Sequence, residues 1–312
     1  MQKAALAKKR APRNRTLEVT DREAASLRDA ILFGGRDGLD SVSCRIVCGD
    51  AFAVLPGLQS SSFDLLFADP PYNLSKTFGN ERFSARAPDE YEEWLDSWLS
   101  LCVPLLKPTA SIYICGDWRS GSAIERAGSR YFRPRNRITW EREKGRGAKA
   151  NWKNAAEDIW FFTVSDDFTF NLDAVKQRRK VIAPYRENGR AKDWDETGGF
   201  RDTHPSNIWT DISVPFWSMP ENTDHPTQKP EKVLAKIILA STNTRDAILD
   251  PFAGSGTTAV VAKKLGRDFV AIESDEDYCL LAQKRLDLAE HDRSIQGFAD
   301  GVFWERNSKL PK

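Results

Sequence analysis

The chain is poor in the residues that hold metals or cross-link secreted proteins. Its 312 residues include five Cys and three His, and no two Cys form a Cys-x-x-Cys pair. This scarcity argues against a zinc site and favours reduced, buried thiols. No run approaches the roughly 18 apolar residues that a membrane span needs, and the N-terminus has no apolar signal-peptide core. The sequence therefore predicts a cytoplasmic protein with no membrane partner.

The chain also lacks an excess of charge of either sign. Lys and Arg total 46 and Asp and Glu total 45, which gives a formal net charge of +1. The net charge therefore does not indicate a nucleic-acid partner. An apolar content of 40% supports a sizeable core. The length suits one large α/β domain with an insertion, or two domains.

Apolar segments alternate with amphipathic ones along most of the chain. The pattern predicts strands at 43–50, 63–69, 110–115, 137–140, 158–163, 247–250 and 269–273. It predicts helices at 89–106, from 230, at 258–265 and at 277–289. Such alternation is typical of an α/β fold with a doubly wound, mostly parallel sheet. Residues 165–224 show little periodicity, and an irregular stretch this long inside a compact domain is usually functional.

A Gly-rich turn, Asp-Pro-Phe-Ala-Gly-Ser-Gly-Thr-Thr, follows the predicted strand 247–250. Gly254 and Gly256 permit positive φ and let backbone approach a ligand closely. The turn opens a helix whose free N–H groups attract anionic groups. A kinase or ATPase would need Lys where Thr257 stands, and the Gly-x-Gly-x-x-Gly of an NAD site is absent. A purely structural turn is the alternative.

Two acids end neighbouring predicted strands. Glu273 is placed to accept both hydroxyls of a ribose, and Asp50 is placed to accept from an adenine amino group. In open α/β sheets, ligands bind at the carboxyl ends of strands. A helix-capping role is the alternative for either acid.

A second turn, Asp69-Pro70-Pro71-Tyr72, follows the apolar run 63–68. The Asp69 carboxylate and the Pro70 carbonyl can both accept hydrogen bonds from an exocyclic amine, which localises the nitrogen lone pair for attack on an electrophilic methyl group. The two prolines fix the turn and remove competing N–H donors, and Tyr72 offers a face for stacking. A base inside a duplex must be flipped out to reach such a pocket. Catalysis then rests on orientation.

Together these motifs resemble those of S-adenosylmethionine-dependent amino-methyltransferases of DNA. Their order resembles the β group of N6-adenine enzymes, with the catalytic turn first and the Gly-rich turn last. A further match is His225-Pro226-Thr227-Gln228-Lys229-Pro230, which precedes the cofactor half in that group. The resemblance covers about 43–290. It implies a Rossmann-like methyltransferase fold, circularly permuted, with an inserted target-recognition region.

The resemblance assigns roles residue by residue. The implied catalytic residues are Asp69, Pro70, Pro71 and Tyr72. S-adenosylmethionine is the implied cofactor, and its expected contacts are Asp50, Asp69, His225, Lys229, Asp250, Phe252, Gly254, Gly256, Thr257 and Glu273. Lys229 would sit near the methionine carboxylate. Glu273 departs from the family, where this position is often Asp.

The resemblance also divides the chain. The predicted segments are an N-terminal extension at 1–42, the catalytic half at 43–140, target recognition with some core strands at 141–224, the cofactor half at 225–290 and a C-terminal tail at 291–312. Basic residues gather in the recognition segment, where phosphate binding is favoured over a merely solvated surface. The candidate DNA-binding residues are Arg142, Lys144, Arg146, Lys149, Lys153, Arg178, Arg179 and Lys180.

The first hypothesis is therefore a site-specific N6-adenine DNA methyltransferase acting on duplex DNA. N4-cytosine enzymes share the chemistry but more often have Ser where Asp69 stands, and RNA enzymes more often have Asn there. A non-catalytic DNA-binding regulator is the alternative of a different class, and the intact Asp69, Tyr72, Gly254 and Gly256 argue against it. A homodimer and a cognate restriction endonuclease are further expected partners, although no segment demonstrates either.

Overall fold

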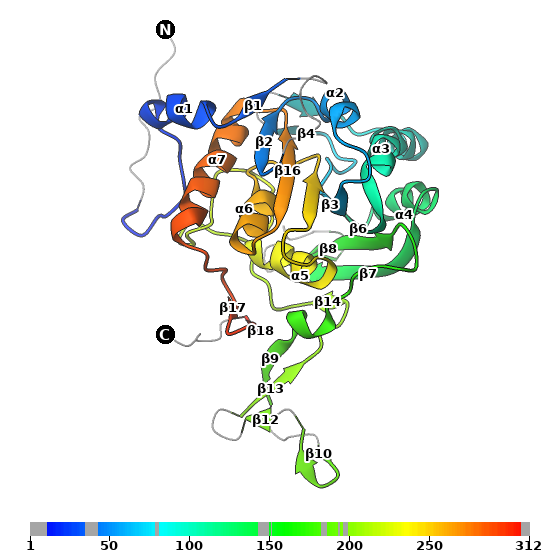
Figure 1. Ribbon diagram of the computed structural model, residues 1–312, viewed down its shortest axis with the longest axis vertical. Helices are drawn as coiled ribbons and strands as arrows, with labels where there is room; N and C mark the ends of the chain where they lie inside the picture. The colour runs from blue at the N-terminus through cyan, green and yellow to red at the C-terminus, as the bar shows by residue number, and fades with distance from the viewer. Residues whose placement is uncertain are drawn as a thin grey trace.

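A nine-stranded sheet forms the centre of the computed structural model, which describes residues 11–34, 43–78, 81–142, 150, 152–181, 186–192, 194–195 and 199–306. In spatial order its strands are β1 (Leu32–Phe33), β2 (Arg45–Cys48), β16 (Asp268–Glu273), β15 (Ala247–Asp250), β3 (Phe63–Ala68), β6 (Leu106–Gly116), β8 (Ala156–Thr163), β7 (Arg133–Glu141) and β14 (Ile208–Trp209). Strands β15 and β16 come late in the sequence but lie between β2 and β3 (Figure 1).

Of these nine strands, only β8 runs against the rest. The pairs from β1 to β6 are all parallel, as is β7 with β14, whereas β8 is antiparallel to both β6 and β7. The predicted doubly wound, mostly parallel sheet is confirmed. So is the circular permutation, because the Gly-rich half enters the centre of the sheet from the C-terminal part of the chain.

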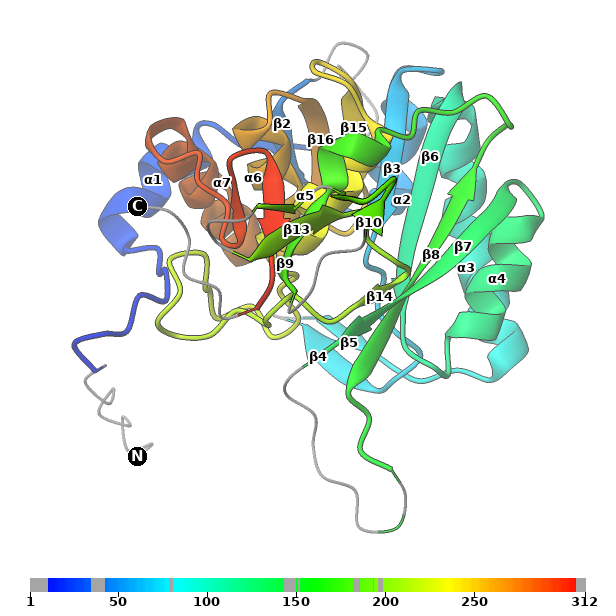
Figure 2. The same cartoon turned by 90° about the horizontal axis from the view of Figure 1, so that it is seen from below.

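Helices cover both faces of the sheet (Figure 2). The helices are α1 (Asp21–Arg28), α2 (Ala51–Val54), α3 (Pro88–Cys102), α4 (Gly121–Ser129), α5 (Glu231–Ser241), α6 (Thr257–Lys264) and α7 (Glu276–His291). Strand β3 shows why two layers form, since Leu65 and Phe67 pack into the core under α5–α7 while Leu66 and Ala68 pack into the core under α2–α4. Within the described part of the chain, no helix is both long and apolar enough to cross a membrane.

Helix boundaries differ from the sequence pattern at prolines. The 3-10 turns are η1 (Leu55–Gly57), η2 (Val103–Leu105) and η3 (Leu172–Val175). Pro104 lies in η2, so α3 ends at Cys102 rather than near 106. Pro230 is the N-cap of α5 rather than its first residue. Helix α1 ends at Arg28, after which the chain turns into edge strand β1.

The irregular segment after β8 forms small sheets that extend away from the body (Figure 1). They consist of β9 (Gln177–Lys180), β12 (Trp194–Asp195) and β13 (Phe200–Thr203), joined by β17 (Phe298–Ala299) and β18 (Val302–Trp304), together with the hairpin of β10 (Arg186–Glu187) and β11 (Arg190–Ala191). A separate hairpin of β4 (Lys76–Phe78) and β5 (Glu81–Phe83) lies between β3 and α3 in the chain. Strand β18 pairs in parallel with β9. The expected C-terminal tail therefore contributes two strands to the insertion.

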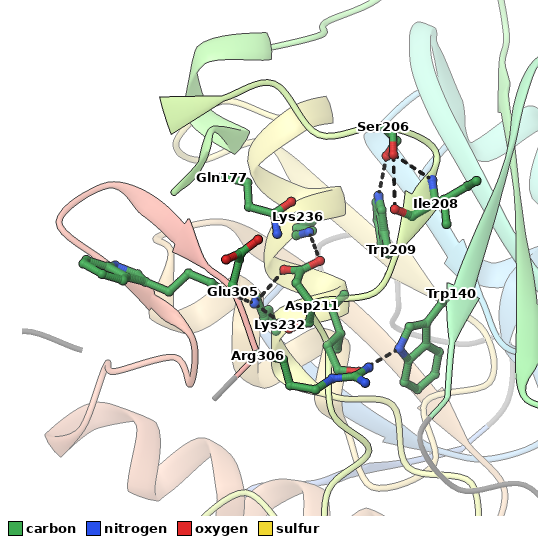
Figure 3. A network of polar contacts seen from close by, with 12 residues as sticks. Trp140, Gln177, Ser206, Ile208, Trp209, Asp211, Lys232, Lys236, Glu305 and Arg306 are labelled. Atoms are coloured by element: carbon green, nitrogen blue, oxygen red, sulfur yellow. Dashed lines mark hydrogen bonds and ion pairs between the residues drawn. The ribbon is translucent and has the colours of Figure 1, made fainter. Parts of the chain in front are cut away.

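A buried ionic cluster anchors this extension to the body (Figure 3). The Asp211 carboxylate, on the loop after β14, forms an ion pair with Lys232 at 2.6 Å and accepts from Lys236 at 2.7 Å, both on α5. Lys232 also donates to the carbonyl of Trp304 in β18 at 2.5 Å. Asp211, Lys232 and Lys236 are each under 8% exposed. One helix thus ties the insertion and the C-terminal strands together.

Candidate active site

A cavity of about 520 Å³ opens at the carboxyl edge of the sheet, where β2, β3, β15 and β16 end. Both sequence motifs contribute to its wall. The predicted residues that line it are Asp50, Asp69, Pro70, Pro71, Tyr72, Arg142, His225, Lys229, Asp250, Phe252, Gly254, Thr257 and Glu273. Its volume and position suit a small-molecule site of an open α/β sheet.

The Gly-rich turn packs against the hexapeptide that begins at His225. Gly254 has φ +51°, and a Cβ there would lie 2.8 Å from the imidazole Nε2 of His225. The His225 ring in turn meets the Tyr278 ring edge-on, with centroids 4.5 Å apart. Glycine at 254 therefore lets two segments distant in sequence close one wall of the cavity.

Gly256 lies at the start of α6, where that helix packs against α7. It does not line the cavity; it is the N-cap of α6, with φ +74°. A Cβ there would lie 2.5 Å from the Cβ of Ala282 in α7. Its absence of a side chain lets α6 pack against α7 directly behind the cofactor wall, so a direct contact of Gly256 with a cofactor stays a prediction.

Gly256→Ala is expected to lower the free energy of unfolding by about 2–4 kcal/mol, combining left-handed strain with a steric clash. Gly301→Ala is the matched control, because φ is +72° and no atom lies within 4 Å of the added Cβ. It should lose only about 1–2 kcal/mol. Urea unfolding of both variants measures their free energies of unfolding. If both variants lose the same amount, the contact with Ala282 contributes nothing to the loss in Gly256→Ala.

Two carboxylates face the cavity from strand ends. The Glu273 carboxylate accepts from the backbone N–H of Gly254 at 2.8 Å and of Asp275 at 2.9 Å, and burial raises its pKa. Asp50 caps α2 by accepting from the N–H of Phe52 at 3.0 Å, and it lines the cavity as well. The capping and ligand-binding interpretations of Asp50 are thus compatible, since each carboxylate oxygen has two lone pairs.

Asp250 is buried at the end of β15, where burial raises its pKa to about 7. Because the unfolded chain releases this proton near pH 4, the group's contribution to stability is full below pH 4 and is lost as pH rises through 7. Asp250→Asn should remove that loss, so the variant should gain stability relative to the parent between pH 5 and pH 8. Urea unfolding at both values tests this, and a pH-independent difference would contradict it.

The catalytic turn is fixed by hydrogen bonds from three sides. The Tyr72 hydroxyl donates to Asp69 Oδ1 at 3.0 Å, and Lys229 Nζ donates to Asp69 Oδ2 at 2.5 Å. From α3, the Tyr91 hydroxyl donates to the carbonyl of Pro71 at 3.0 Å. The turn therefore holds the Asp69 carboxylate rigidly at the cavity wall.

Glu157 belongs to this network and was missed by the sequence analysis. Its carboxylate lies 3.5 Å from Lys229 Nζ, accepts from the Tyr72 hydroxyl at 3.3 Å and pairs with Arg142. Glu157 is the second residue of β8, and because β8 runs antiparallel its amino end reaches the edge where the parallel strands finish. The signal available in the sequence was an acid at the start of an apolar strand.

The network sets the charge states of its members. Burial alone lowers the pKa of Lys229, but the carboxylates of Asp69 and Glu157 outweigh burial and raise it above its usual value. Burial, followed by the same two carboxylates, raises the pKa of the Tyr72 phenol. Lys229 is therefore a cation and Tyr72 a neutral donor at neutral pH. The predicted contact of Lys229 with a cofactor carboxylate stays a prediction.

Aromatic rings form a further part of the wall. Phe252 of the Gly-rich turn packs against Trp98 at 5.1 Å and Trp94 at 6.1 Å, both on α3. Trp94 also meets Phe83 of β5 at 5.1 Å. Trp94 and Phe83 line the cavity. Helix α3 thus joins the two motif-bearing turns.

The candidate DNA-binding residues divide into four groups. Arg142 lines the cavity, while Lys153 and Lys180 are exposed. Arg178 donates to both carboxylate oxygens of Asp202 at 2.7 Å, and Arg179 lies 3.9 Å from Glu305, so phosphate binding would compete with existing pairs. The remaining three, Lys144, Arg146 and Lys149, lie outside the described residues.

The sequence profile of the DNA methylase family, N6_N4_Mtase, matches residues 63–284. Type II methyltransferase M.HpaI of Haemophilus parainfluenzae is 35% identical over 248 residues, which cover 78% of this chain and 74% of that protein. DNA adenine methyltransferase YhdJ of Escherichia coli (strain K12) is 36% identical over 254 residues, covering 79% and 83%. The matched range 63–284 of the family profile includes both motif-bearing turns.

Solved structures show the same fold. The M1.HpyAVI–SAM complex matches with a TM-score of 0.53 and 25% identity, covering 78% of this chain and 98% of that one. The cytosine-N4-specific PvuII DNA methyltransferase matches with a TM-score of 0.57 and 16% identity, covering 83% and 95%. The second likeness concerns the fold alone, because chains this divergent on one fold need not share a substrate.

Proposed function

Because the chain belongs to the DNA methylase family, we propose that it transfers a methyl group from S-adenosylmethionine to the N6 amino group of an adenine flipped out of duplex DNA. The observation that carries the proposal is the single cavity whose wall holds both the Asp69–Tyr72 turn and the Gly-rich turn. The relative named as a DNA adenine methyltransferase supports adenine as the target.

The residues present fit S-adenosylmethionine. When bound, this cofactor supplies an electrophilic methyl group. Glu273 would accept the ribose hydroxyls, Asp50 would accept from the adenine amino group and Phe252 would offer an apolar face; all three line the cavity. Because Gly254 packs closely on His225, the backbone of the turn would be able to approach the cofactor.

The catalytic turn would act by orientation. Asp69 and the Pro70 carbonyl accept hydrogen bonds from the exocyclic amine and aim its lone pair into the cavity. Lys229 and Tyr72 keep Asp69 fixed while leaving lone pairs on both of its oxygens free. Tyr72 would stack on the flipped base. Such fixed acceptors act without reorganising during the reaction.

The proposal also covers the residues that contact DNA and the expected protein partners. We propose that 141–224 recognises the target sequence, with Arg142 at the cavity and Lys153 on the surface contacting phosphates. A homodimer and a companion restriction endonuclease remain predictions. Sedimentation of the purified protein with and without duplex DNA would determine the oligomeric state.

The direct test is methyl transfer from labelled S-adenosylmethionine to unmethylated bacterial DNA, followed by digestion to nucleosides. N6-methyladenine is the expected product. N4-methylcytosine would replace the proposal with the cytosine alternative. Cofactor binding without any methylated base would refute catalysis on DNA and favour a non-catalytic regulator.

A further inference from the structure

An exposed tryptophan stands on a rigid turn at the end of β6. Trp118 is 66% exposed, which is unusual for a side chain this large and apolar. The neighbouring Asp117 carboxylate accepts from the N–H of Arg119 at 3.1 Å, and from the N–H of Ser120 at 2.9 Å and its hydroxyl at 2.7 Å. The same turn starts α4. These bonds hold the backbone so that the indole is presented to solvent in a fixed place.

This turn is attached directly to the catalytic turn. Strand β6 is the neighbour of β3 and runs parallel to it, so both turns lie at the same edge of the sheet. The Ser120 hydroxyl lies 3.4 Å from the backbone N–H of Asn73, the residue after Tyr72. Trp118 is two residues from Ser120, yet it is not among the residues that line the cavity. Trp118 therefore lies outside the cavity, beside the catalytic turn.

We propose that Trp118 enters the DNA duplex at the position that the target base vacates and stacks between the neighbouring bases. Extruding a base costs stacking and pairing energy, and an apolar side chain inserted between base steps offsets part of that cost. The Arg119 guanidinium lies 5.1 Å from the indole ring centroid, which places a positive charge beside the ring where phosphates would pass. The proposal rests on the proposed function, because it assumes that a base is flipped.

The test compares two duplexes once the methylated site has been mapped. In one the target adenine faces thymine, and in the other it faces an abasic nucleotide, which removes the pairing cost of extrusion. Trp118→Ala should lower kcat/KM on the paired duplex by roughly ten- to hundredfold, the usual effect of losing one aromatic stacking partner. On the abasic duplex the variant should recover most of the parent rate, with unchanged affinity for S-adenosylmethionine.

Two controls separate this role from a general effect. Phe170→Ala removes another exposed aromatic, 47% exposed, next to the C-terminal end of α5 and away from the cavity, and should match the parent on both duplexes. Trp152→Ala removes a 96% exposed indole that belongs to a different loop. The proposal is overturned if Trp118→Ala has the parent rate on the paired duplex or loses rate equally on both duplexes. It is also overturned if only Trp152→Ala loses rate on the paired duplex and regains it on the abasic one. If the parent methylates no site in DNA, so that none can be mapped, the proposed function itself fails.

Discussion

Asp69→Ala is expected to abolish measurable methyl transfer, with a loss of at least roughly 10²–10³-fold in kcat, while S-adenosylmethionine still binds. The substitution removes the carboxylate that would accept from the reacting amine and that orders Tyr72 and Lys229. The Glu157 carboxylate, 3.5 Å from Lys229 Nζ, remains in the variant. The buried ammonium group of Lys229 therefore keeps a counter-charge. Single-turnover transfer and calorimetric titration of the cofactor measure the two effects separately.

A matched control lies on the strand that leads to Asp69. Asp64 is near the start of β3, where it pairs with Lys107 at 2.7 Å and does not line the cavity. Asp64→Ala should alter thermal stability modestly and leave kcat near the parent value. Full turnover by Asp69→Ala would refute the catalytic assignment, and loss of cofactor binding in step with turnover would mean that Asp69 is mainly a cofactor-binding residue.

The sequence predicted the centre of the site because each half is encoded locally. An apolar run that ends in Asp-Pro-Pro-Tyr, and another that ends in a Gly-rich turn, specify strands and turns from adjacent residues. Parallel strands then bring both turns to the same edge of one sheet. The placement of the Gly-rich half in the same sheet followed from the circular permutation that the family resemblance implied.

The contacts that were not predicted depend on long-range pairing. Glu157 joins the site because β8 is reversed relative to its neighbours, which no local pattern in 156–163 specifies. Helix α4 contains two glycines, so its propensity is weak, yet Gly128 allows close packing, because a Cβ there would lie 2.7 Å from the Phe162 ring. Strands β17 and β18 form because β9 offers a free edge, although it lies more than a hundred residues earlier in the chain.

Asp211→Ala is expected to cause the largest loss of stability, about 3–5 kcal/mol, because it leaves two buried ammonium groups without their counter-charge. Burial by itself raises the pKa of Asp211, but Lys236 and Lys232 outweigh burial and lower it, so the carboxylate is charged at neutral pH. The loss should appear in urea unfolding at pH 7. Glu290→Ala, which breaks the exposed pair with Lys263, is the control and should lose at most about 1 kcal/mol.

The pH dependence of that loss distinguishes a charge effect from a packing effect. Burial lowers the pKa of Lys236 to about 8 although Asp211 opposes the shift, and removing Asp211 should lower it further. A lysine whose pKa is lower in the folded state costs stability at low pH, and the cost fades as pH rises toward its unfolded value near 10.4. Because the pKa of Lys236 is about 8 in the parent and lower in the variant, the deficit of Asp211→Ala should be largest at pH 6 or below and shrink as pH rises toward 8. A deficit that stays constant from pH 6 to pH 10 would assign the loss to packing, and one no larger than that of Glu290→Ala would show that α5 does not anchor the insertion through this cluster.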